Sequence, residues 1–200
     1  MRRLISSCFL LAAALFICVT AQAQDKKAPD HDHDHANIAP NGAVCKIRPT
    51  KGNKLFGLLT LKQKDGHVLI RGSVRGLTPG EHGFHIHEFG DMRGSDGKAT
   101  GGHFNPKGHK HAGLDSKERH VGDFGNITAD ADGVAKVNIK AAGLSLYSVI
   151  GRAFVVHGGT DDLKSQPSGA AGPRIGTGVI GIAGPFQAKP AAKPAAKPAK

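Results

Sequence analysis

Apolar residues recur at every second position in several segments of this chain, and this period of two constrains the fold more than any other feature of the sequence. In the segment HVLIRGSVRG, which begins at residue 67, Val68, Ile70 and Val74 fall on one face of an extended chain. Mostly polar residues fall on the other face. Residues 135–139 alternate in the same way. These segments therefore predict half-buried β-strands.

Turn signals and glycine-rich stretches separate the predicted strands. The Asp-Gly pairs at 65–66 and 132–133 are the strongest short-range signal for a tight hairpin. No segment offers a long amphipathic helix, and the stretches 90–119 and 158–176 are too rich in glycine and proline for strands. Loops of that length are usually functional or disordered. The sequence predicts an all-β fold, an antiparallel sandwich or barrel with two long functional loops.

The first 23 residues have the pattern of a secretory signal peptide. They combine a basic start, an apolar run and the small-residue pattern Ala21-Gln22-Ala23. The alternative is a membrane anchor, which needs about 20 apolar residues, whereas this run is shorter and leads into small and polar residues. We therefore expect residues 1–23 to be removed and the protein to be exported, to a periplasm or to the extracellular space.

Composition changes sharply on both sides of the central segment. Residues 24–40 form a polar leader rich in histidine and aspartate, and residues 187–200 form a low-complexity basic tail of alanine, lysine and proline. Neither composition can bury an apolar face, so we expect one folded domain at residues 41–186.

The formal net charge of +11 raises the question of an anionic partner. The tail at 187–200 is evenly charged and lacks aromatic residues, so we expect no specific nucleic-acid partner. Two interpretations stay open for it: loose association with anionic surfaces, or an inert solvated spacer.

Cysteine usage is unusual for an exported domain. Removal of residues 1–23 takes away Cys8 and Cys18 and leaves Cys45 alone, so the expected mature chain cannot form an intramolecular disulfide. Small exported domains commonly gain such cross-links. Cys45 lies in AVCKI on the first predicted strand and is most simply a small buried apolar residue.

Histidines are concentrated in one predicted strand and in the loops. In GEHGFHIHEFGD, His85 and His87 share one face of a strand while Ile86 faces the core, which makes half a metal site. A lone His-x-His pair is also common as surface decoration. Downstream, further potential ligands follow: His103, His109, His111, His120, Asp123 and His157. Three imidazoles with a carboxylate suit tetrahedral zinc, and several imidazoles suit copper; satisfied or solvated histidines are the remaining alternative.

Four separated motifs, GFHIHEFGD, GGHFNP, ERHVGDFGN and GPRIGTGVIGIA, closely resemble those of the copper/zinc superoxide dismutases, in order and spacing. The resemblance covers most of 41–186 and implies a Greek-key, immunoglobulin-like β-sandwich or barrel. It implies one copper per chain, held by His85, His87, His103 and His157. It also implies one zinc per chain, held by His103, His111, His120 and Asp123, so that His103 bridges the metals. His109 is a near-miss beside His111.

The same resemblance implies roles in catalysis and assembly. Copper would alternate between Cu(II) and Cu(I) as superoxide is converted to O₂ and H₂O₂, while zinc stays structural. His103 would pass a proton to the peroxide product, and Arg174 would attract the superoxide anion. Asp161 would orient one imidazole of each site. The residues that match the family's homodimer patch are Phe89, Gly90, Gly151 and Ile182.

Two departures from the family pattern concern the loops. Gly97 and Thr177 stand where the family has two cysteines, whose disulfide ties the loop at 90–102 to the barrel. We expect the loop to be held instead by metal ligation, by packing of Phe104 and Pro106, and by a hydrogen bond from Arg174 to a loop carbonyl. The loop between His157 and Arg174 is also shortened, which leaves Lys164 and Ser168 as candidate lining residues.

An alternative of another class is an exported copper-binding or copper-buffering protein without significant turnover. The tract HDHDH in the leader supports it, because alternating histidine and aspartate can capture Cu(II) or Zn(II). A solvated polar leader is the plainer interpretation of the same tract. The complete ligand sets and Arg174 favour the enzyme, because a buffer needs no arginine that guides an anion.

Overall fold

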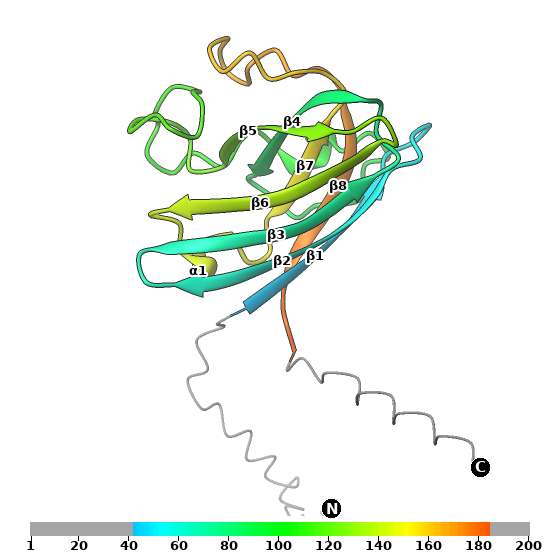
Figure 1. The fold of residues 1–200 in the computed structure, drawn as a ribbon. Coiled ribbons are helices and arrows are strands. Elements are labelled where there is room, and N and C mark those ends of the chain that lie inside the picture. Colours follow the sequence, from blue (N-terminus) through cyan, green and yellow to red (C-terminus); the bar gives the residue numbers. More distant parts are fainter. Residues whose placement is uncertain (1–41, 185–200) are drawn as a thin grey trace, which may run out of the picture. The chain divides into compact units, whose positions relative to one another are not determined.

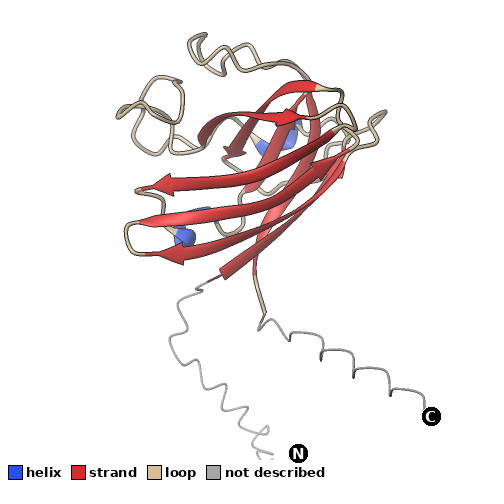
Figure 2. Cartoon of the chain, in the orientation of Figure 1, coloured by secondary structure: helices blue, strands red, loops and turns tan. Residues whose placement is uncertain are grey.

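The computed structural model describes residues 42–184, and strands are the predominant regular structure of this segment (Figure 2). The strands are β1 (Gly42–Pro49), β2 (Phe56–Lys64), β3 (His67–Arg75), β4 (Gly80–His87), β5 (Asp123–Ala129), β6 (Val134–Ala142), β7 (Ala153–His157) and β8 (Arg174–Ile182). A 3₁₀ turn at Lys98–Thr100 and the short helix α1 (Leu146–Val149) complete the regular structure. Neither helical segment is long and apolar enough to cross a membrane.

The eight strands close into one antiparallel barrel with the order β1-β2-β3-β6-β5-β4-β7-β8 (Figure 1). Strand β3 pairs with β6 rather than with β4, and β4 pairs with β7, so the chain crosses between neighbours as in a Greek key. The predicted all-β antiparallel fold is confirmed. The predicted signal peptide, leader and basic tail lie outside the described residues.

Alternation of side chains explains why these segments are strands. Val68, Ile70 and Val74 on β3 are fully buried, as are the apolar residues at the matching positions of β1 and β2. The two predicted Asp-Gly turns join β2 to β3 and β5 to β6. Gly66 and Gly133 adopt φ values of 69° and 71°, which favour glycine over residues with a Cβ.

Strand β4 departs from simple alternation, because both of its faces are buried from His82 to His87. On the barrel side, Phe84 stacks on Phe154 of β7 with ring centroids 4.9 Å apart. On the other side, His85 and His87 are 0% and 1% exposed. The imidazoles of His85 and His87 therefore lie between the apolar interior of the barrel and the loops that cover them.

The two predicted long loops occur close to their expected bounds. Residues 88–122 and 158–173 contain no strand and only the 3₁₀ turn at Lys98–Thr100. The second loop ends three residues earlier than the sequence predicted, because β8 already begins at Arg174, which pairs with His157.

Cys45 faces the barrel interior and is a free thiol. Its Sγ donates a hydrogen bond to the carbonyl oxygen of Gly178 at 3.1 Å. Burial raises the pKa of the Cys45 thiol to about 12. The thiol is therefore protonated at any physiological pH, in agreement with its expected role as a small core residue.

This burial predicts that Cys45 reacts with iodoacetamide at pH 8.5 only as fast as the barrel unfolds, because the thiolate is the nucleophile. Peptide mapping by mass spectrometry measures labelling of Cys45 separately from the other cysteines. The same protein in concentrated guanidinium is the positive control and should be labelled within minutes. Equally fast labelling of the folded protein would show that Cys45 is accessible.

Candidate metal centre

Two groups of buried side chains converge where β4, β7 and the two long loops meet. In each group, one potential ligand atom per residue lies within 4.8 Å of the others. The four-histidine cluster consists of His85, His87, His103 and His157. The mixed cluster consists of His103, His111, His120 and Asp123. The structure thus brings together all seven residues that the resemblance assigned to metals.

Strand pairing positions the four-histidine cluster. His85 and His87 lie on one face of β4, which pairs with β7, and His157 is the last residue of β7. His103 comes from the first long loop, and an isolated antiparallel bridge joins its backbone to that of His87. Three ligands thus come from the barrel and one from the loop.

Five imidazole nitrogen atoms in the clusters are buried and have no hydrogen-bond partner within residues 42–184. They are His85 Nδ1, His87 Nε2, His103 Nε2, His111 Nδ1 and His157 Nε2. Buried polar atoms are nearly always paired, and each unpaired one costs about 1–3 kcal/mol. A bound cation would satisfy these lone pairs, so the donor set fits metal ligation.

In the four-histidine cluster, the ring nitrogen opposite each unpaired nitrogen has a neighbour that holds it. His87 Nδ1 lies 2.9 Å from the carbonyl oxygen of Gly101, and His157 Nδ1 lies 3.0 Å from that of Gly172. These carbonyls accept from Nδ1–H and leave Nε2 free as a ligand. Both rings are therefore held in the tautomer that a metal requires.

Burial also keeps these imidazoles uncharged. It lowers the pKa of His87 to about 2, that of His157 to about 3 and that of His85 to about 4. Neighbouring imidazoles lower these pKa values further, although Asp161 works in the opposite direction on His85. The three rings are thus neutral at pH 7, as metal ligands must be.

His103 has one ring nitrogen in each cluster. Its Nε2 is the unpaired atom that faces the four-histidine cluster, and its Nδ1 lies 2.7 Å from Asp123 Oδ1. The ring packs against that of His85 with centroids 3.9 Å apart. The geometry is that of an imidazole able to bridge two cations.

In the mixed cluster, Asp123 contacts all three imidazoles. Its Oδ2 lies 3.1 Å from His111 Nδ1, and its Oδ1 lies 3.2 Å from His120 Nδ1. Tetrahedral zinc with bonds of about 2.0–2.1 Å separates its ligand atoms by about 3.3 Å. An outward shift of at most about 0.6 Å from the observed separations would therefore accommodate zinc. Three nitrogens and one carboxylate oxygen are a typical zinc donor set.

Asp161 contacts one histidine of each cluster. Its Oδ2 lies 2.7 Å from His85 Nε2, and its Oδ1 lies 2.9 Å from His111 Nε2. Asn126 of β5 holds the backbone of Asp161 through two hydrogen bonds of 2.8 and 2.9 Å. Burial alone would raise the pKa of Asp161, yet the bonds to His111 and His85 hold it below its usual range. A single carboxylate thus orients one ring of each cluster.

Arg174 is anchored by three hydrogen bonds to the first long loop. Its Nη1 donates to the carbonyl oxygen of Gly97 at 2.7 Å and to Thr100 Oγ1 at 3.1 Å, and its Nη2 donates to the carbonyl oxygen of Gly101 at 2.7 Å. A pocket of about 410 Å³ opens between Arg174, Ser168 and the four-histidine cluster. Ser168 lines this pocket as expected, whereas Lys164 is exposed and does not line it.

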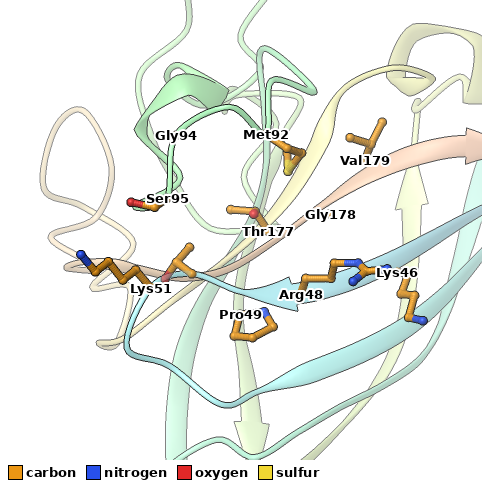
Figure 3. Close-up of a pocket in the computed structure, with 11 residues that line it drawn as sticks. Lys46, Arg48, Pro49, Lys51, Met92, Gly94, Ser95, Thr177, Gly178 and Val179 are labelled. Atoms are coloured by element: carbon orange, nitrogen blue, oxygen red, sulfur yellow. The ribbon is translucent and has the colours of Figure 1, made fainter.

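Gly97 and Thr177, which stand where the resemblance places two cysteines, face each other. A Cβ built on Gly97 would lie 2.9 Å from Thr177 Cγ2. A pocket of about 510 Å³ lies beside Thr177, between β1 and the 92–95 segment. Figure 3 shows the side chains that line it. The pocket contains no member of either cluster. The structure therefore has direct packing where a cross-link would stand.

Other contacts hold the loop, and one of the expected contacts is wrong. The expected bond from Arg174 to a loop carbonyl is present twice. Phe104 is buried, with the Arg152 guanidinium 3.7 Å from its ring centroid. Pro106 is exposed and contributes no core packing, because the chain turns outward after Phe104.

Three nearby polar residues lie outside both clusters. His109 bonds to the loop backbone, with Nδ1 3.3 Å from the carbonyl oxygen of Arg119. His82 is buried, with Nδ1 2.8 Å from the carbonyl oxygen of His157. Gln166 was missed by sequence reasoning. Its Oε1 accepts from the backbone N–H of His111 at 2.8 Å and its Nε2 donates to the carbonyl oxygen of His111 at 2.9 Å.

Comparison with known proteins points to one family. A family model described as copper/zinc superoxide dismutase (SODC) matches residues 55–180. The chain is 40% identical over 184 residues to the extracellular superoxide dismutase (Cu-Zn) of Onchocerca volvulus, covering 85% of this chain and 90% of that protein. It is 41% identical over 162 residues to superoxide dismutase (Cu-Zn) 3 of Arabidopsis thaliana, covering 76% and 98%.

A solved structure gives the same result for the fold. The crystal structure of the clock protein EA4 matches with a TM-score of 0.67 and 37% sequence identity. The match covers 72% of this chain and 96% of that chain.

The amide of Gln166 predicts a measurable effect on the mixed cluster. Replacing Gln166 with Ala should weaken zinc binding about tenfold, because loss of an outer partner of a ligand typically costs that much. Competition with a chromophoric chelator measures the affinity. Gln63→Ala is the matched control, because Gln63 also accepts from a backbone N–H, at 2.8 Å, but at Leu146. Equal zinc affinity in Gln166→Ala and wild type would remove this role.

Proposed function

The chain belongs to the copper/zinc superoxide dismutases, enzymes that convert two superoxide anions into O₂ and H₂O₂, and we propose that the two clusters are its copper and zinc sites. Copper takes His85, His87, His103 and His157 as ligands. Zinc takes His103, His111, His120 and Asp123. The set of buried unpaired imidazole nitrogens, with His103 shared between the clusters, is the observation that carries this assignment.

When bound, copper supplies the redox couple that oxidises one superoxide and reduces the next, while zinc is redox-inert and structural. His103 would contribute one ring nitrogen to each cluster, and its Nε2, when it is not a ligand, can hold one of the two protons that the peroxide product takes up. Asp161 keeps His85 and His111 in the orientation in which each presents Nδ1 as the ligand atom.

Arg174 guides and positions the anion. Three of its five N–H donors are used on the loop, which leaves Nε and one Nη2 hydrogen for a small anion. Within residues 42–184 no carboxylate forms an ion pair with it, so its charge is uncompensated by a direct contact. A fixed guanidinium in the wall of the pocket attracts the superoxide anion and raises its local concentration.

The first long loop, β8 and the turn before β7 together carry the patch for a homodimer in this proposal. Phe89 and Ile182 are 56% and 63% exposed, and Val179 beside them is 40% exposed. Apolar side chains of this size on one surface favour contact with a second copy. This proposal places Gly90 and Gly151 in the same contact.

Location and domain plan follow the sequence pattern. We propose a signal peptide at 1–23, a leader at 24–40, the catalytic domain at 41–186 and a tail at 187–200 that associates loosely with anionic surfaces. The relative from Onchocerca volvulus is named an extracellular enzyme, which supports export to the extracellular space or a periplasm. Family membership sets aside the copper-buffering alternative.

Ligand replacement tests the assignment. His157→Ala should abolish dismutation while one zinc per chain is retained, because His157 belongs only to the four-histidine cluster. Asp123→Ala should instead lose zinc first. Metal analysis of purified protein, alongside a gel activity stain, measures both. Unchanged copper and zinc in the two variants would refute the assignment.

Charge reversal tests the role of Arg174. Arg174→Gln should slow dismutation about tenfold, and Arg174→Glu at least tenfold more, within the range of 10–10³ that electrostatic focusing contributes. The wild-type rate should fall with added salt.

Arg174→Lys is the control, because it keeps the charge and loses the forked hydrogen bonds to the loop. It should retain the salt dependence. A rate for Arg174→Glu equal to that of wild type, measured by pulse radiolysis, would show that the anion is guided by another group.

A further inference from the structure

Strands β2, β3 and β6 turn to solvent a face whose charged residues in the three strands are all basic. Alternation places every second residue of each strand outside the barrel. Six exposed cations occupy these outward positions, and we call them the basic face. They are Lys62 and Lys64 on β2, Arg71 and Arg75 on β3, and Lys136 and Lys140 on β6. The other outward positions of these strands carry no carboxylate.

The register of the strands keeps the six cations apart from one another. Arg71 lies opposite Thr60 on one side and Asn138 on the other, and Lys136 lies opposite Ser73. Every cation of the face is paired across the strands with an uncharged residue. Diagonal neighbours on adjacent strands are about 7–8 Å apart. Lys62, Arg71 and Lys136 therefore form a straight diagonal row across three strands.

The charges on this face are uncompensated within the described part of the chain. None of the six cations takes part in an ion pair there. Arg71 donates to the neutral Asn138 Oδ1 at 3.2 Å. The carboxylates of Asp65 and Asp130 lie in the turns beyond the strand ends, and that of Asp130 accepts backbone N–H bonds of its own turn.

The basic face is separate from the features already assigned. Strands β2, β3 and β6 contribute no residue to either metal cluster. The proposed dimer patch uses Phe89, Val179 and Ile182, which lie on other elements. Six like charges on a rigid sheet repel one another and destabilise the isolated fold. An anionic occupant would remove that repulsion.

We propose that the basic face binds an acidic polysaccharide, a linear polymer with carboxylate or sulfate groups along its length. The diagonal row matches a chain that crosses the strands, and the guanidinium groups of Arg71 and Arg75 can pair with oxyanions through two parallel bonds. The face is built from strands at fixed spacing, so it is organised before the polymer arrives.

Two other polyanions fit this face less well. Single-stranded nucleic acid is held by base stacking on aromatic side chains, and the face has one aromatic residue, Phe56, at its margin. A bilayer needs apolar side chains that insert among the cations. The exposed apolar side chains of this face, Phe56 and Leu58, lie together at the start of β2, to one side of the diagonal row.

The test compares two triple variants of the full metallated protein with equal change in charge. The face variant is Lys62→Gln, Arg71→Gln and Lys136→Gln. The control variant replaces Lys54, Lys107 and Lys117 with Gln; these lysines are exposed and lie outside the three strands. The basic tail is present in both. Binding to alginate and to dextran sulfate is measured at several salt concentrations, with zinc content and activity as checks on folding.

The face variant should bind both polysaccharides at least tenfold more weakly than wild type, with a shallower salt dependence, while the control stays within about threefold because its charges lie elsewhere. Equal losses in the two variants would mean that net charge alone governs binding and would overturn the proposal. Tighter, face-dependent binding to duplex DNA or to phosphatidylserine vesicles than to either polysaccharide would also overturn it.

Discussion

The need to satisfy buried imidazole nitrogens organises this protein. Five ring nitrogens lie in the interior without a hydrogen bond to the described residues, and one of them, His111 Nδ1, lies 3.1 Å from Asp123 Oδ2. The opposite nitrogens of most of these rings are fixed by backbone carbonyls or by Asp161. Such an arrangement costs free energy until cations occupy it. Metal binding therefore stabilises the folded chain as well as equipping it for catalysis, since ligands that bind only the native state shift the folding equilibrium.

The guanidinium of Arg174 joins the catalytic pocket to the stability of the loop. It spends three donors on the backbone and side chain of residues 97–101, and it lines the pocket beside the four-histidine cluster. The carbonyl of Gly101 also accepts from His87 Nδ1, so one carbonyl orients both a member of the four-histidine cluster and the arginine. Gly97 and Thr177 are in contact but are not covalently linked. The hydrogen bonds of Arg174 therefore hold the loop to the barrel in place of a disulfide.

Much of the barrel and of the metal clusters could be predicted from the sequence, because both depend on short-range patterns. Alternation identified Val68 and Ile70 as core residues, and the family resemblance, carried by the order and spacing of the motifs, named the residues that the structure brings together in the two clusters. The contact of Gln166 with His111 joins residues 55 positions apart and leaves no local pattern. The exposure of Pro106 could not be predicted either, because proline suits a loop whether it packs inward or turns outward.

Closure of the barrel also bears on how this protein resists aggregation by strand addition. Because β8 pairs with β1, the barrel has no free strand edge to which another chain could add. The joint between β5 and β6 is its shortest, with the single register pair Ala129–Ala135. Parting there would expose the edge of β6, whose outward positions include Lys136 and Lys140. Charges on an edge strand oppose the addition of a strand from another chain. The short joint between β5 and β6 is therefore protected against aggregation if it opens.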